Sequence, residues 1–280
     1  MRGISYGSRL GGHRKRWTRF ILPGYTVLLL LFLIAPILMM ILYGFNDIPG
    51  IAERQSAKFF GFTLDWYRRL FEDPLLTGAV RNSIFIAITA ATLSTPLGTL
   101  LGLALGRYGF RGRGGVSFII FMAIAVPEIV LGSSLLAMYV QVGAPLGLAT
   151  ILLAHIGFDT PFVAVTVRAR VSGMDRSMED AAKDLFASPL VAFLRVTLPI
   201  IAPGIMAGFM LSFVLSLDDF VITNFVSGNT TTFPLYVYAT QKMGIPPTVN
   251  VFGTVLFLAG VSIALFGLFR GLLKGKSAAA

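Results

Sequence analysis

The chain has 280 residues, of which 55% are hydrophobic and only 13% are charged, and its mean hydropathy is +0.80. Soluble domains are about one-quarter charged, so this composition excludes an ordinary soluble protein and indicates a membrane protein. The absence of cysteine excludes disulfides, thiolate nucleophiles and cysteine-based metal sites, and the net charge of +10 lies mostly beside apolar stretches, where it determines topology rather than nucleic-acid binding.

Six apolar segments approach or meet the length of about 20 residues that a helix needs to cross a bilayer. We therefore predict an all-α membrane protein with six transmembrane helices, at residues 20–45, 80–105, 116–140, 146–167, 199–226 and 251–273. Most of the 23 Lys and Arg residues fall in the two terminal tails and in the loops after the second and fourth helices. The positive-inside rule therefore predicts that both termini are cytoplasmic.

The first span follows a basic stretch, as in a secretory signal, but its apolar run is too long for a signal and no small-residue cleavage site closes it. We predict a retained helix. The expected organisation is a cytoplasmic tail at 1–19, a transmembrane domain at 20–273 and a second tail at 274–280. Residues 62–71 of the first outer loop carry apolar side chains at helical spacing, which is typical of a segment lying along the membrane surface.

Four carboxylates fall within the predicted spans, and no Lys or Arg lies deep inside a span to neutralise them. Because a charge within a membrane is costly, such acids face protein, water or a cation. Their number suits a pathway for a dication or polycation. The alternative is that they cap broken helices, accept hydrogen bonds freed by prolines, or stay protonated. The four candidates are Glu128, Asp159, Asp218 and Asp219.

His155 and Asp159 are spaced so that they share one helical face, which predicts a structural hydrogen-bonded pair. With one histidine in the membrane, a histidine zinc site or a proton relay has too few members, and we predict no metal. Tyr139, Tyr236 and Tyr238 fit either a cation-π surface for an amine or an interfacial aromatic belt.

A possible nucleotide-binding loop at 271–277 fails because only three residues separate its glycines and no strand precedes it. We therefore predict neither enzymatic activity nor a bound cofactor. If ATP drives this protein, another chain hydrolyses it.

The loop 168–198 contains a charged segment that does not contribute to crossing the bilayer. We predict that this segment binds a soluble partner. Its spacing resembles the loop motif of ABC importer permeases, which is Glu-Ala-Ala, three residues, Gly, nine residues, then Ile, any residue and Leu-Pro. Asp180-Ala181-Ala182 begins the match and Val196-Thr197-Leu198-Pro199 ends it. Phe186 stands in the glycine position, where a positive φ would strain it by roughly 1–3 kcal/mol.

The fifth predicted span indicates a subfamily, because Leu215-Ser216-Leu217-Asp218-Asp219 is similar to the corresponding stretch of spermidine/putrescine permeases. It implies a type I importer permease in the bacterial inner or plasma membrane that transports polyamines. The implied partners are a second permease, two ATPase subunits and an extracytoplasmic substrate-binding protein. The family places a coupling helix that contacts the ATPase at Glu179, Asp180, Ala181, Ala182, Lys183, Asp184, Leu185 and Phe186.

Two pairs of glycines, Gly98 with Gly102 and Gly204 with Gly208, have the spacing of small-residue helix contacts and fit packing against a homologous or identical permease. Other functions stay open from the residues alone. A secondary transporter or channel would use the same acids, and 4-aminobutyrate, another amine or a metal ion are alternative substrates. A membrane-embedded enzyme is disfavoured because no set of nucleophile, base and orienting group is present.

Overall fold

The computed structural model describes residues 18–56, 58–175 and 177–277, and within these residues it contains helices, turns and one isolated β-bridge. The predicted tail at 1–19 thus lies outside the described residues up to residue 17, as do the last three residues of the tail at 274–280. The chain divides into two compact units, residues 1–70 with 243–280 and residues 71–242. The all-α prediction is confirmed.

The first unit pairs α1 (Thr18–Gly44) with α12 (Pro247–Ser277). Between them the chain forms a 3-10 turn (Ala52–Gln55) and the short helix α2 (Asp65–Arg68), which packs on α12. The buried Asn46 side chain orders this loop, since its Nδ2 donates to the Lys58 carbonyl over 2.8 Å and its Oδ1 accepts from the Phe60 N–H over 2.7 Å. The predicted surface segment at 62–71 is therefore helical over only four residues.

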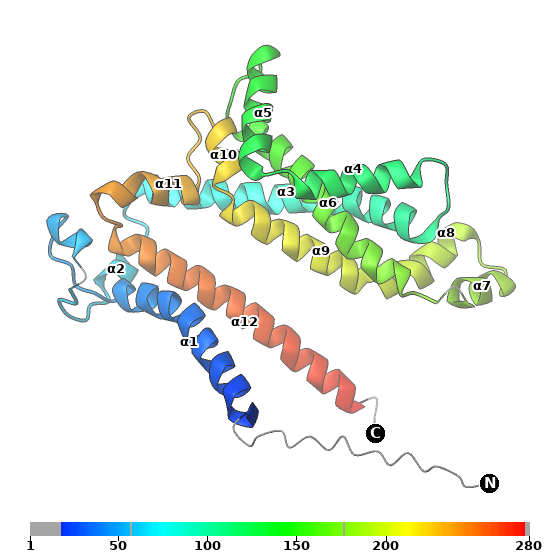
Figure 1. Ribbon diagram of the computed structural model, residues 1–280, viewed down its shortest axis with the longest axis horizontal. Helices are drawn as coiled ribbons and strands as arrows, with labels where there is room; N and C mark the ends of the chain where they lie inside the picture. Colours follow the sequence, from blue (N-terminus) through cyan, green and yellow to red (C-terminus); the bar gives the residue numbers. More distant parts are fainter. Residues whose placement is uncertain (1–17, 57, 176, 278–280) are drawn as a thin grey trace, which may run out of the picture. The chain divides into compact units, whose positions relative to one another are not determined.

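The second unit carries the remaining helices, and three of them, α3, α6 and α9, pack against one another as its centre (Figure 1). α4 and α10 lie on α6, α5 packs on α10, and α11 packs on α3. The bounds are α3 (Pro74–Arg107), α4 (Arg113–Ala125), α5 (Glu128–Gln141), α6 (Leu148–Ser172), α7 (Ser177–Asp184), α8 (Pro189–Ala192), a π-helical turn (Phe193–Thr197), α9 (Leu198–Asp218), α10 (Val221–Val226), α11 (Phe233–Thr240) and a 3-10 turn (Gln241–Met243).

Four described helical segments are long and apolar enough to cross a bilayer, and a fifth crossing results if α4 and α5 count as one bent span. The four are Ile21–Gly44, Pro74–Arg107, Leu148–Ser172 and Pro189–Asp218. The predicted sixth span lies in α12, which is 31 residues long and has its described apolar part at Pro247–Ser262.

The glycine pattern of α3 explains how closely α3 and α6 approach. A Cβ on Gly98 would lie 2.5 Å from the Val163 Cβ, and one on Gly102 would lie 2.7 Å from the Ala164 carbonyl oxygen. Gly208 of α9 also faces Val163, and Gly204 faces the Arg170 side chain of α6. These small-residue faces are thus used within the subunit. Their side toward α6 is occupied within the subunit, and packing of the bundle against a second permease stays a prediction.

Adding one methyl group at two positions of α3 is expected to have opposite effects. Gly102→Ala places a Cβ against backbone atoms of α6 and should lower the free energy of unfolding by about 1–3 kcal/mol, as overpacking does. Gly78→Ala meets nothing within 4 Å, so it should raise that free energy by about 0.5–1 kcal/mol. Thermal unfolding of both variants in detergent measures the difference, and equal effects would contradict the close α3–α6 approach.

Candidate functional site

The predicted third span at 116–140 is not one straight helix, because α4 and α5 meet at an angle of 102°. Val126 and Pro127, which join them, are extended, with ψ values of 129° and 133°. Proline has no N–H to continue a helix, and it disfavours helical backbone at the residue before it. The break places Glu128 in the first turn of α5.

The predicted fifth span at 199–226 is also interrupted. α9 ends at Asp218, Asp219 is extended with φ −62° and ψ 120°, and α10 begins at Val221. The Asp219 carboxylate caps α10, since Oδ2 accepts from the Thr223 N–H over 2.8 Å and from its hydroxyl over 2.7 Å, and Oδ1 accepts from the Ile222 N–H over 3.3 Å. A cap of this kind stabilises a helix that starts inside the fold.

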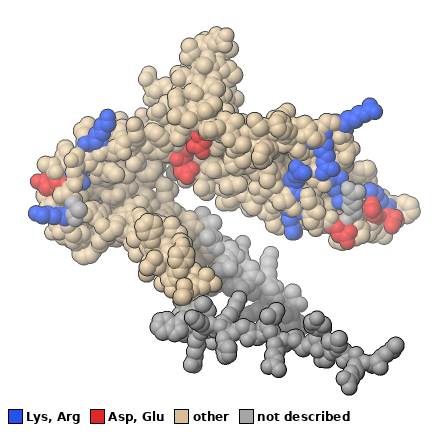
Figure 2. Space-filling model, viewed as in Figure 1, with Lys and Arg blue, Asp and Glu red and all other residues tan. Residues whose placement is uncertain are grey.

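The two breaks lie together. α5 packs on α10, and a Cβ on Gly132 of α5 would lie 2.7 Å from the Phe225 ring of α10. The carboxylate of Glu128 is consequently close enough to Asp218 and Asp219 for electrostatic repulsion. Figure 2 shows acidic side chains gathered near the end of α9, apart from the acidic side chains of α7.

The end of α9 adds negative potential to this group. The last carbonyl groups of a helix have no partner within it, and the helix dipole is negative at this end. Asp218, the last residue of α9, and Glu128 are both exposed at the surface of the subunit. The arrangement can attract and hold a cation without a resident metal, and no cluster of three or more metal-ligating side chains occurs among the described residues.

The other two candidate acids are buried and bound by the protein. Asp219 is 9% exposed and Asp159 is 0% exposed. The predicted His155–Asp159 hydrogen bond is wrong, because both ring nitrogens of His155 have partners on α9 and α10 instead. Its Nε2 lies 3.0 Å from the Thr223 hydroxyl and 3.2 Å from Asp219 Oδ2, and its Nδ1 lies 2.7 Å from the Ser216 hydroxyl. His155 thus joins α6 to both sides of the α9–α10 break.

Asp159 joins α6 to α9 and α3 through two serines. The Ser212 hydroxyl donates to Asp159 Oδ2 over 2.7 Å, and the Ser94 hydroxyl lies 2.8 Å from that of Ser212, within hydrogen-bond distance. The other Asp159 oxygen, Oδ1, is buried and has no hydrogen-bond partner among the residues that the structure describes. Sequence reasoning missed both serines, since a small hydroxyl in an apolar helix carries no signal of its partner.

Two replacements of Asp159 are expected to separate its hydrogen bond from its packing. Asp159→Asn keeps an acceptor for Ser212 and should change stability little. Asp159→Leu has a similar size but leaves the Ser212 hydroxyl without its acceptor, and should lower the free energy of unfolding by about 1–3 kcal/mol. Thermal unfolding in detergent measures both, and equal stability of the two variants would contradict a structural hydrogen bond.

The three candidate tyrosines have different surroundings. Tyr139 is buried, and its hydroxyl donates to the Thr150 carbonyl over 3.3 Å. Tyr236 is also buried, and its hydroxyl donates to Asp73 over 2.7 Å. Tyr238 is exposed and packs on Phe220, with the two ring centroids 4.7 Å apart. Phe220 directly follows Asp219 in the chain. Of the three, Tyr238 is thus placed to offer an aromatic face near the acidic group.

The loop predicted to contact an ATPase contains α7, and exposed apolar side chains directly follow this helix. None of the α7 residues is buried, and Lys183 and Asp180 form an exposed ion pair of 2.9 Å. Leu185 is 82% exposed and Phe186 is 97% exposed. Phe186 has φ +59°, so the residue in the family's glycine position does adopt the left-handed backbone that glycine favours.

One α7 side chain faces the bundle instead. The Glu179 carboxylate forms an ion pair with Arg107 and accepts the Thr197 hydroxyl over 2.7 Å. Burial alone would raise the pKa of Glu179, but the hydrogen bonds from Arg107 and Thr197 and the positive charges of Arg107 and Lys183 outweigh it and lower the pKa. No motif in the sequence marks Arg107 as the partner of Glu179, because a contact between residues far apart in the chain has no local pattern.

Comparison with known proteins agrees with this architecture. Residues 98–275 match the family described as "Binding-protein-dependent transport system inner membrane component". The putrescine transport system permease protein PotI of Escherichia coli K12 is 41% identical over 255 residues, which are 87% of this chain and 89% of PotI. The spermidine/putrescine transport system permease protein PotC of Haemophilus influenzae is 37% identical over 247 residues, 88% of this chain and 94% of PotC.

Solved structures share the fold at low sequence identity. A chain of a bacterial ABC transporter involved in the import of the acidic polysaccharide alginate superimposes with a TM-score of 0.66 at 17% identity, covering 95% of this chain and 99% of that one. A chain of the MetNI methionine ABC transporter, in an inward-facing conformation, superimposes with a TM-score of 0.57 at 20% identity, covering 70% of this chain and 94% of that one.

Proposed function

This chain belongs to the family of binding-protein-dependent transport system inner membrane components, and from that membership we propose that it forms half of the translocation pathway of an ATP-driven polyamine importer. The substrate class rests on two independent supports. The relatives PotI and PotC are named for putrescine and spermidine transport. The acidic group of Glu128, Asp218 and Asp219 suits a substrate with two or more positive charges.

The observation that carries the proposal is the meeting of two helix breaks, each with a carboxylate. Backbone that leaves the helical path inside a membrane is tolerated where it lines a cavity or is covered by protein. Broken helices in transporters mark the substrate site for this reason. We propose that Glu128 and Asp218 contact the ammonium groups. The buried Asp219 caps α10 at its break, the buried Asp159 holds α6 against α9, and both add negative potential.

Energy comes from a separate subunit in this proposal. Two ATPase subunits bind the cytoplasmic loops of this chain and of a second permease, and an extracytoplasmic binding protein delivers the substrate from the other side. The exposed residues from Asp180 to Phe186 form the contact with the ATPase, whereas Glu179, which was predicted to share that contact, faces the bundle. Both termini lie in the cytoplasm. Closure of the ATPase dimer moves α7 and opens the pathway outward, and hydrolysis resets it.

Uptake in cells tests the proposed substrate class. Cells that lack their own polyamine importers would receive this chain with its second permease, ATPase and binding protein, and uptake of labelled putrescine and spermidine would be measured. We expect ATP-dependent uptake that unlabelled polyamines inhibit and that 4-aminobutyrate or divalent metal ions do not. Inhibition by one of those solutes instead would overturn the polyamine assignment, and uptake without the ATPase would overturn the importer mechanism.

A further inference from the structure

The coupling helix α7 lacks an apolar anchor. None of its eight residues is buried, and Met178, beside Glu179, has half of its surface exposed. A short helix of this kind needs some other tie to stay in register with the bundle, since isolated helices of this length are not stable in water.

The Glu179 carboxylate supplies such a tie to two other elements. It forms an ion pair with Arg107 and accepts a hydrogen bond of 2.7 Å from the Thr197 hydroxyl. The side chains are largely sheltered from water, at 10% exposure for Arg107 and 18% for Glu179, and Thr197 is 4% exposed. Shelter of this degree strengthens charged hydrogen bonds relative to those of the exposed Asp180–Lys183 pair.

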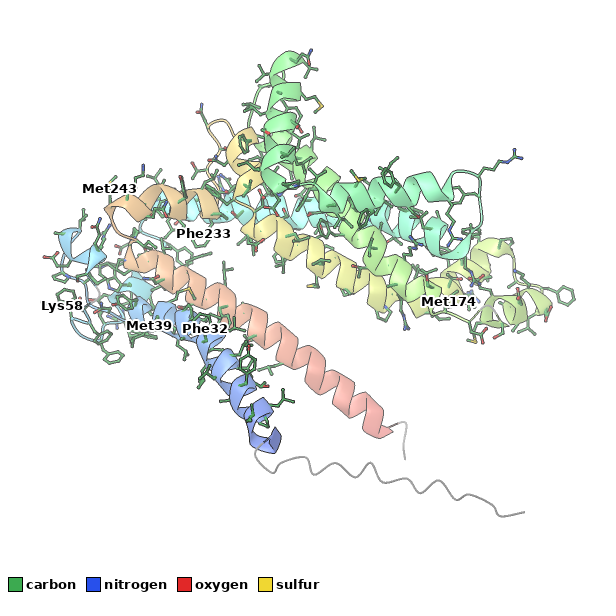
Figure 3. The ribbon with its side chains drawn as sticks, viewed as in Figure 1. Phe32, Met39, Lys58, Met174, Phe233 and Met243 are labelled. Atoms are coloured by element: carbon green, nitrogen blue, oxygen red, sulfur yellow. The ribbon has the colours of Figure 1, made fainter. Side chains whose placement is uncertain are left out.

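The two partners of Glu179 stand at the ends of the central helices. Arg107 is the last residue of α3, and Thr197 is the last residue of the π-helical turn that leads into α9. Single π-helical turns often occur at functional positions, because the extra residue redirects a side chain. At this end of the bundle α3, α6 and α9 share one core around Val167 and Ile201, onto which Met174 packs (Figure 3).

From these contacts we propose that Glu179 is a positioning residue that fastens α7 to α3 and α9, so that a movement of α7 is passed directly to the helix that ends at Asp218. α9 has 21 residues and is therefore about 31 Å long, which makes it a rod between the α7 end and the acidic group. Glu179 acts inside the permease, whereas Asp180 and Phe186 point outward. The inference rests on the proposed coupling to an ATPase.

The test measures transport and ATP hydrolysis separately in the reconstituted complex with its ATPase and binding protein. Glu179→Gln and Arg107→Gln should keep the ATPase bound and hydrolysing, while putrescine uptake per ATP falls about tenfold, equivalent to about 1.4 kcal/mol of coupling. The double variant Glu179→Arg with Arg107→Glu should recover much of that ratio. Arg113→Gln is the matched control, because Arg113 also binds the end of α3, at the Leu105 carbonyl over 2.7 Å, but does not touch α7 through that contact.

Expression level and unfolding temperature would be recorded for every variant, so that the ratio is compared among folded complexes. An unchanged ratio in both single variants would overturn the role of Glu179 and leave the proposed importer intact. Loss of the bound ATPase would also overturn it, since Glu179 would then be a docking residue. A wild-type complex without ATP-driven polyamine uptake would overturn the proposed function and this inference together.

Discussion

Replacing Asp218 by Asn and Glu128 by Gln together is expected to reduce putrescine uptake by about 100-fold or more, with the chain still folded and the ATPase still bound. A hydrogen bond to a charged group contributes about 1.5–3 kcal/mol, and each 1.4 kcal/mol corresponds to about a factor of ten. Both side chains are exposed at the surface of the subunit, so their amides remove charge without leaving a buried group unpaired. Each single variant should lose about tenfold.

The matched control is Asp65→Asn, which removes the same charge from an exposed ion pair with Arg68 outside the acidic group. Its uptake should stay close to that of the wild type, because exposed ion pairs contribute little. Initial rates at several putrescine concentrations would separate a higher KM from a lower kcat. Wild-type kinetics in the double variant would contradict the assignment of Glu128 and Asp218 to the substrate pathway.

Replacing Phe186 is expected to weaken binding of the ATPase by about 10- to 100-fold, since burying a side chain of this size contributes about 1.5–3 kcal/mol. The side chain is 97% exposed in this subunit and sits on a left-handed backbone with φ +59°. A phenylalanine held in this way costs stability, and among the described residues nearly all of its surface stays uncovered. We therefore propose that a partner covers it, and the proposed partner is the ATPase.

Two replacements at this position separate docking from strain. Phe186→Ala and Phe186→Gly should weaken ATPase binding equally, but Phe186→Gly should also raise the free energy of unfolding of the isolated permease by about 1 kcal/mol, because glycine adopts a positive φ without strain. Phe62→Ala, which removes another exposed phenylalanine from the outer loop, is the control. Titration of the ATPase onto immobilised permease measures the affinity. An undiminished affinity in both Phe186 variants would place the contact elsewhere on the loop.

The sequence predicted the fold class and the family, because each of these leaves a local pattern. Apolar runs of span length indicated an all-α membrane protein, and the spacing from Asp180 to Pro199 indicated an importer permease. The family match over residues 98–275 confirms that interpretation. The conditional prediction that Phe186 would be strained also holds, since its φ is positive.

Features that depend on helix rotation or on a break within an apolar run could not be predicted in the same way. The run at 116–140 is apolar on both sides of Glu128, so hydropathy alone does not separate a straight span from the bend at Pro127. Side chains one helical turn apart bond to each other only if no hydrogen-bond partner on a neighbouring helix takes their place. His155 has such partners in Ser216, Thr223 and Asp219, and it does not bond to Asp159.

The small-residue faces predicted close contact but did not identify the partner helix. Gly98 and Gly102 pack on α6 of the same chain, although their spacing fits a contact between subunits equally well. The Glu179–Arg107 contact joins residues separated by several helices, and no motif connects them. A contact between residues so far apart in the chain can be identified only from the folded structure.

ATP hydrolysis by the complex, reconstituted in lipid with its ATPase and binding protein, tests the central claim most directly. The rate would be measured as putrescine or spermidine is added, for the wild type and for the Glu128→Gln, Asp218→Asn double variant. The account predicts that a polyamine accelerates hydrolysis in the wild type, and that uptake is lost in the double variant. Acceleration by a different solute would contradict the polyamine pathway, and purification of the permease without any ATPase subunit would contradict the importer itself.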